Sequence, residues 1–294
     1  MLAELKELWK FRELLWSLVE RELKIRYKNS ILGFLWSLLN PLVTALVMTL
    51  VFRFFLNQHV SSYGLYVLAA YLPFLFFQFA LMDSSQSILL ALPMVRKVYF
   101  PREVIPLAQI LANFIHLVLA LGVFVVIALA VWIKNPPHIF PIQATVIYLP
   151  LVLLVNFCLA TGLGLLVCAL NTFYEDVKYV LGALLYMLFF LSPVMYFSET
   201  VYYKTHQMEA NGDLFYTLYH LNPIAMLCTA YRKVWLAPVD VPIGEKINGI
   251  PQAVQPALPL DWGLFLITAA TSFAVLVFGY HVFNRMKWRF VERP

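Results

Sequence analysis

A stripe of aromatic residues in the apolar segment 178–197 has the composition of a sugar-binding surface. The residues that recur there at helical spacing are Gly182, Tyr186, Phe189, Pro193 and Tyr196. Aromatic rings stack on the apolar faces of sugars, and tyrosine hydroxyls can hydrogen-bond to sugar hydroxyls. The same pattern is typical of an interhelical core with an interfacial aromatic residue at Tyr196, and the spacing alone favours this second interpretation.

A second stripe, small and polar, runs along the otherwise apolar segment 31–56. Its members are Ser30, Gly33, Ser37, Asn40 and Thr44. Such a face either lets helices approach closely and hydrogen-bond, or borders a polar conduit. Pro41 leaves a backbone carbonyl unpaired, and inward-facing polar groups or conduit water can satisfy it.

Residue patterns of catalytic and metal sites are absent from the sequence. There is no GxxxxGK[ST] motif, no HExxH motif and no pair of carboxylates inside an apolar segment, so we expect no ATP hydrolysis by the chain itself. His116 shares a helical stripe with Gln109 and Asn113, and hydrogen bonding between helices explains it more simply than a proton relay or a ligand role. The three cysteines show no spacing that indicates a metal site or a disulfide framework.

The composition is that of an integral membrane protein. Of the 294 residues, 62% are hydrophobic and 13% are charged, and the mean hydropathy is +0.78. Soluble domains carry roughly 25% charged residues. The net charge of +5 then reflects Lys and Arg in cytoplasmic segments rather than nucleic-acid binding.

The apolar runs predict an all-α membrane protein with six transmembrane helices. The expected spans are 31–56, 64–82, 104–133, 142–170, 178–197 and 261–284. Residues 1–29 predict an amphipathic helix that lies at the membrane interface, with a helix packed on the protein as the alternative. Fifteen Lys and Arg residues fall on one side and six on the other, so both termini are expected in the cytoplasm, with residues 285–294 as a cytoplasmic tail.

The segment 198–260 is expected on the outer face. Residues 218–235 are apolar but are interrupted by Asn222-Pro223, which predicts a re-entrant or surface-lying helix. Residues 237–260 are rich in Pro and Gly and predict an exposed irregular excursion.

The connection 92–106 is short, cationic and aromatic. Val98, Tyr99 and Phe100 are expected to be exposed at its tip, ringed by Arg96, Lys97 and Arg102. Exposed apolar residues among charges are typical of a docking surface for a cytoplasmic partner.

Five stretches, in order, resemble the permease subunit of polysaccharide ABC exporters, the type-two group that moves O-antigen, capsule or teichoic acid chains. They are RYKNSILGFLWSLLNPL (26–42), VRKVYFPREVIPL (95–107), NTFYEDVKYV (171–180), LSPVMY (191–196) and LNPIAMLCTAYRKVW (221–235). The resemblance covers nearly the whole chain and implies a single transmembrane domain over 1–294 in a bacterial plasma membrane. This sequence departs from the family at Glu175-Asp176, where a basic residue often precedes the Asp, so a cationic contact there is doubtful.

The resemblance also implies partners and site residues. It implies a homodimer bound to two separate ABC ATPase subunits, which would bind ATP and Mg, so that this chain needs no cofactor. The implied ATPase-coupling residues are Arg96, Lys97, Tyr99, Phe100, Pro101, Arg102 and Glu103. The implied outer gate comprises Asn222, Pro223, Tyr231 and Arg232, and the implied channel-lining residues are Ser37, Asn40, Thr44, Tyr186, Phe189 and Tyr196.

Substrate entry is the subject of a hypothesis about the four cations before the first span, which are Arg21, Lys24, Arg26 and Lys28. At headgroup level each cation contributes roughly 1 kcal/mol toward anionic groups, so they could attract the phosphate of a lipid-linked substrate. Plain positive-inside topology explains the same residues without a substrate and is favoured. Two other functions stay open, a small-molecule or drug exporter of the same permease class and a multispan glycosyl or acyl transferase.

Overall fold

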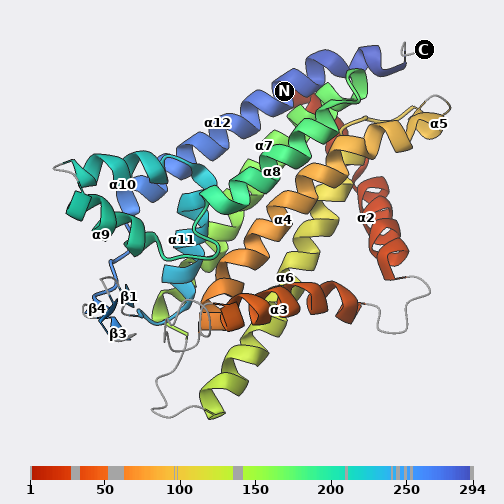
Figure 1. Ribbon diagram of the computed structural model, residues 1–294. Coiled ribbons are helices and arrows are strands. Elements are labelled where there is room, and N and C mark those ends of the chain that lie inside the picture. Colours follow the sequence, from red (N-terminus) through yellow and green to blue (C-terminus); the bar gives the residue numbers. More distant parts are fainter. Residues whose placement is uncertain are drawn as a thin grey trace.

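The protein folds as a bundle of long helices with smaller elements at its two ends (Figure 1). The computed structural model describes residues 2–27, 34–51, 63–95, 97, 99–134, 142–208, 211–239, 241–242, 246–247, 250–251 and 254–291. Both termini and the short helix α5 (Leu92–Val95) lie at one end of the bundle, called here the terminal end. The predicted all-α class is confirmed in its main feature, because the strands are only two residues long.

Four long helices form the centre of the bundle. They are α4 (Tyr63–Leu90), α6 (Val104–Lys134), α7 (Leu149–Phe173), which continues the 3-10 helix η2 (Ala144–Tyr148), and α12 (Trp262–Met286). Helix α4 packs against α6 and α7, and α7 packs against α12. In the described part of the chain these four segments are long and apolar enough to cross a membrane. They coincide with the expected spans two, three, four and six, except that α4 runs on to Leu90.

The expected first and fifth spans are shorter helices. Helix α3 (Phe34–Leu50) packs on α4 and runs across the bundle rather than along it (Figure 1). Helix α8 (Val177–Leu191) ends before Pro193, so the predicted helix over 178–197 was wrong in its last turn and a half. Ser192 has an extended backbone (φ −98°, ψ 149°), as expected for a residue that precedes proline.

The N-terminal segment forms two helices, α1 (Leu2–Lys10) and α2 (Arg12–Tyr27). Leu18 and Val19 of α2 are buried together with Ala108 and Ala112 of α6, so the packed-helix alternative is confirmed for this side of α2. Trp9 and Trp16 are exposed, which leaves a separate aromatic surface for a membrane interface.

The opposite end of the bundle, called here the ribbon end, carries three helices and a β-ribbon. The helices are α9 (Ser198–Met208), α10 (Gly212–His220) and α11 (Pro223–Trp235). In the ribbon, β1 (Val241–Pro242) pairs with β4 (Val254–Gln255), and β2 (Lys246–Ile247) pairs with β3 (Ile250–Pro251), both antiparallel. The prediction of an irregular excursion was therefore wrong for these strand residues, which pair in two short two-stranded sheets.

Two glycines bring the backbones of α7 and α12 into direct contact. A Cβ added at Gly162 would lie 2.6 Å from the backbone of Leu276, and one added at Gly279 would overlap the carbonyl oxygen of Gly162. Backbone on a facing helix cannot swing away as a flexible side chain can, so both positions require glycine.

We expect Gly162→Ala to destabilise the protein by about 3 kcal/mol, because the α7–α12 seam must open to admit one methyl group. Thermal unfolding of the detergent-purified protein measures this. Gly122→Ala is the matched control, since its added Cβ meets no heavy atom within 4 Å. Equal melting temperatures for the two variants would contradict the close seam.

Candidate functional site

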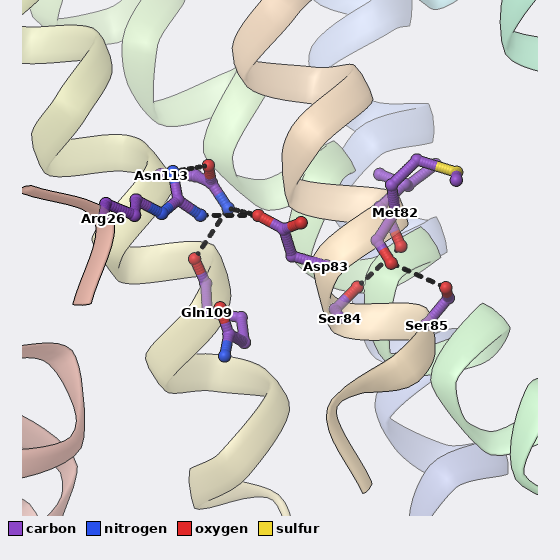
Figure 2. Close-up of polar contacts among 8 residues, drawn as sticks. Arg26, Met82, Asp83, Ser84, Ser85, Gln109 and Asn113 are labelled. Atoms are coloured by element: carbon purple, nitrogen blue, oxygen red, sulfur yellow. Dashed lines mark hydrogen bonds and ion pairs between the residues drawn. The ribbon is translucent and has the colours of Figure 1, made fainter. Parts of the chain in front are cut away.

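Arg26 joins three helices through one polar cluster. From the end of α2, its guanidinium donates to Oδ2 of Asp83 in α4 at 2.5 Å and to Oδ1 of Asn113 in α6 at 2.8 Å (Figure 2). The Asn113 amide donates in turn to Asp83 Oδ2 at 2.9 Å and to the carbonyl of Gln109 at 3.0 Å. A charge-assisted pair that shares an amide bridge is stronger than an isolated surface pair. The cluster therefore holds α2 against α4 and α6.

Sequence reasoning singled out Arg26, Gln109 and Asn113 but not their connection through Asp83. The interpretation of the Gln109–Asn113 stripe as interhelical hydrogen bonding is confirmed for Asn113. Asp83, which directly follows the expected second span (64–82), lies about two turns inside α4. Arg26 and Asp83 are 57 positions apart, and the available signal was that each is a charge near the edge of an apolar run.

The other cations near Arg26 point elsewhere. Arg21 pairs with Glu22 at 2.8 Å and Lys24 pairs with Glu20 at 2.6 Å, and both cations are exposed. They border a shallow groove of about 900 Å³ along α2 between Ser17 and Ile25. Lys28, the fourth predicted cation, lies outside the described residues. Arg26 is thus engaged inside the fold, whereas Arg21 and Lys24 stay accessible to anionic groups.

The segment 97–103 is partly exposed and partly buried. Lys97 and Tyr99 are exposed, the latter by 75%. Phe100 is buried together with Val95, Ile105 and Phe283, so the prediction that Phe100 is exposed was wrong. Its ring faces the bundle because an apolar cluster is available to it there. Arg96 and Val98 lie outside the described residues.

The last three residues of this segment, Pro101, Arg102 and Glu103, attach it to the helix bundle. Pro101 and Glu103 are buried, and Glu103 pairs with Lys287, with Lys287 Nζ at 3.3 Å from Oε1. Arg102 donates to the Lys287 carbonyl. Partial burial lowers the pKa of Arg102, and the nearby Glu103 carboxylate opposes this shift. Arginine is so basic that the guanidinium keeps its charge.

At the ribbon end, the predicted break at Asn222-Pro223 is confirmed. Asn222 caps α11 by accepting a hydrogen bond from the Ile224 amide at 3.1 Å, and Pro223 occupies the first helical turn. Helix α11 is almost entirely buried and packs on α4, α7 and α12. The surface-lying alternative for residues 218–235 is therefore wrong for α11, and the re-entrant alternative agrees with its burial.

Arg232 is the most connected side chain of α11, although only 2% of it is exposed. Its Nε donates to the carbonyl of Tyr66 at 2.9 Å, and its two terminal nitrogens donate to the carbonyls of Tyr196 at 2.7 Å and Val194 at 2.5 Å. The guanidinium carbon lies 4.2 Å from the centre of the Tyr66 ring. One guanidinium thus fastens α11 to α4 and to the turn that follows α8.

A pocket of about 480 Å³ opens beside Arg232 between α11 and the base of the ribbon. Lys233 pairs with the buried Glu199 at 3.1 Å and donates to the Pro259 carbonyl at 3.3 Å. Tyr231, another residue predicted for an outer gate, is buried next to Asn156, with 3.4 Å between its hydroxyl and the amide nitrogen. The predicted gate residues thus anchor α11 in the fold.

The predicted channel-lining residues lie in different environments. In α3, Asn40 is exposed and Thr44 is half-buried, and the side chain of Ser37 is outside the described part. Phe189 packs edge-on against Tyr71 and Phe74 of α4, at centroid distances of 5.9 and 5.5 Å, as the interhelical interpretation requires.

The two tyrosines of the same stripe differ from Phe189. Tyr186 is 68% exposed on the surface of α8. Tyr196 lies beyond the end of α8, and its hydroxyl is 2.9 Å from the hydroxyl of Tyr219. Among the described side chains of the two stripes, those of Asn40 and Tyr186 are therefore open to a ligand or a second subunit.

Known proteins resemble most of this chain in sequence. Residues 13–236 match the family model described as ABC-2 type transporter. The O-antigen export system permease protein of Myxococcus xanthus is 30% identical over 80% of this chain and 85% of its own. A Klebsiella pneumoniae protein of the same description is 24% identical over 95% of this chain and 94% of its own. The polysialic acid transport protein of Escherichia coli is 25% identical over 60% of this chain and 67% of its own.

Proposed function

Because the chain belongs to the ABC-2 type transporter family, we propose that it is the membrane-spanning subunit of an ATP-driven polysaccharide exporter. The observation that carries this proposal is the family match over most of the chain, joined to relatives described as O-antigen and capsule export proteins. O-antigen on a lipid carrier is the first candidate substrate, since the relatives with the most extensive matches carry that description.

The proposed topology has six spans, with α3 and α8 as the shorter ones. An even number of spans places both termini on one side, and the distribution of Lys and Arg assigns that side to the cytoplasm of a bacterial inner membrane. The common location of both termini and of α5 at the terminal end supports this orientation (Figure 1).

The proposed assembly is a homodimer with two cytoplasmic ABC ATPase subunits, which bind ATP and Mg. The coupling segment 96–103 would enter the ATPase through Lys97, Tyr99 and Arg102, together with Arg96. Phe100, Pro101 and Glu103 would hold the segment in position, because they are buried in the fold. In the dimer, Asn40 and Tyr186 would border the polymer path, and Arg21 and Lys24 would attract the phosphate of the lipid carrier at its entry.

The division of the coupling segment gives a testable contrast between neighbours. We expect Tyr99→Ala to weaken binding of the ATPase about tenfold with little loss of stability, because the ring is exposed. We expect Phe100→Ala to destabilise the protein by about 3 kcal/mol, because it leaves a cavity in an apolar cluster. Titration with the purified ATPase and thermal unfolding separate the two effects, and a Tyr99→Ala variant with normal affinity would contradict the coupling assignment.

The proposed function is tested by the ATPase activity of the complex in lipid nanodiscs. We expect a lipid-linked glycan to stimulate ATP hydrolysis, and the matching lipid carrier without glycan to stimulate it less. Stimulation by small apolar drugs, without a response to the glycan, would identify a drug exporter instead.

A further inference from the structure

The last described helix, η3 (Lys287–Val291), is attached to the coupling segment by a buried ion pair. Lys287 is 7% exposed and Glu103 is 1% exposed, and Nζ lies 3.3 and 3.5 Å from the two carboxylate oxygens. A lone charge at either position would be strongly unfavourable at such burial. The two segments, 184 positions apart in the sequence, therefore keep a defined relation to each other.

Aromatic packing fixes the far side of η3. Phe290 is fully buried, with its ring centre 5.5 Å from that of Phe283 and 5.7 Å from that of Phe173. Because the side chains of Lys287 and Phe290 both point into the fold, rotation of the short helix would break the ion pair of Lys287 or the packing of Phe290. The side chains between them, Trp288 and Arg289, are consequently held outward.

Trp288 is 64% exposed and lies against the coupling segment. The Arg102 guanidinium carbon is 5.8 Å from the centre of its ring. Tyr99 is exposed three residues before Arg102, and Arg285, Arg289 and Lys97 are exposed as well. Tryptophan, tyrosine and arginine are the residues enriched at the energetic centres of protein interfaces.

We propose that η3 is a docking element for the ABC ATPase subunit, and that Trp288 enters the partner beside Tyr99. The proposal rests on the proposed function, since it extends the coupling segment by a surface that is continuous with it through Arg102. A protein occupant is favoured over lipid because Trp288 is stacked on the coupling segment itself. The partner would thereby hold the end of α12 directly, as well as the connection between α4 and α6.

The test measures the dissociation constant between the full-length permease in nanodiscs and its purified ABC ATPase subunit. We expect Trp288→Ala to raise this constant about tenfold or more, as loss of an interface anchor does. Trp262→Ala is the matched control, because Trp262 is a partly exposed tryptophan at the opposite end of α12, and we expect it to bind like the parent.

A second variant tests the positioning of η3 rather than the contact itself. Lys287→Met leaves Glu103 without its partner, and we expect it to weaken ATPase binding, while the double variant Lys287→Met/Glu103→Gln recovers stability without recovering affinity. Stability is followed by thermal unfolding, so a folding defect is recognised.

The outcomes distinguish this inference from the proposed function. If Trp288→Ala binds the ATPase like the parent while Tyr99→Ala binds weakly, η3 is not a docking element. The assignment of the coupling segment to ATPase binding is then retained. If Trp288→Ala alters only partition of the protein into anionic vesicles, Trp288 is a membrane-interface residue and the inference is overturned. If the parent protein itself does not bind the ATPase, both proposals fail.

Discussion

Arg232→Met is expected to lower the free energy of unfolding by about 3 kcal/mol or more and to abolish export. The substitution keeps much of the side-chain volume but leaves the carbonyls of Tyr66, Val194 and Tyr196 without their donor. Each buried polar group left unpaired costs about 1–3 kcal/mol. Helix α11 and the turn after α8 would then lose their common attachment to α4.

The measurement is thermal unfolding of the purified variant together with polysaccharide at the surface of complemented cells. Arg232→Lys should recover little, because an ammonium on a flexible stem cannot reproduce the three-way fork of a guanidinium. Lys204→Met is the control, since Lys204 of α9 is exposed and exposed substitutions usually change stability by less than about 0.5 kcal/mol. A melting temperature unchanged from the parent would mean that water satisfies the three carbonyls.

Reversal of the charge at Arg26 should reduce export at least tenfold, and reversal of its partner should restore it. Arg26→Asp sets two carboxylates beside each other between α2 and α4, and like charges at that distance repel. The double variant Arg26→Asp/Asp83→Arg re-creates the pair in the opposite sense, and the Asn113 amide can turn to serve both groups.

Export in cells that lack the native permease measures this effect, with membrane insertion checked by fractionation. Arg12→Glu is the matched control on the same helix, because Arg12 is exposed and donates only to the Trp9 carbonyl among the described hydrogen bonds. If the single and double variants at Arg26 export equally poorly, the ion pair with Asp83 does not account for the loss. Arg26 then acts on the substrate, as the substrate-entry hypothesis states.

The sequence predicted those features that depend on local pattern. The limits of α6 and α12 follow from long apolar runs in which proline and Lys or Arg occur only near the ends. The start of α11 follows from Asn222-Pro223, which supplies a cap and a first-turn proline. The exposure of Tyr99 followed from its position in a short polar connection.

The features that were missed depend on contacts between distant segments. Phe100 and Tyr99 are adjacent aromatic residues in the same short connection, and the cluster around Phe283 is what buries the ring of Phe100. Glu103 and Lys287 each resemble ordinary interfacial charges until α12 brings them together. The paired strands after α11 were missed because their Pro and Gly content is also that of an irregular loop.

The contact of Gly162 with Gly279 has a mechanical consequence. Helices whose backbones touch cannot slide past each other without one carbonyl striking the next residue, so α7 and α12 behave as one strut. Any shape change that opens a path for a polymer must then occur at other seams, such as those of α3 and α8. A force applied at the end of α12 would therefore be transmitted along both helices to α11, which packs on α7 and α12.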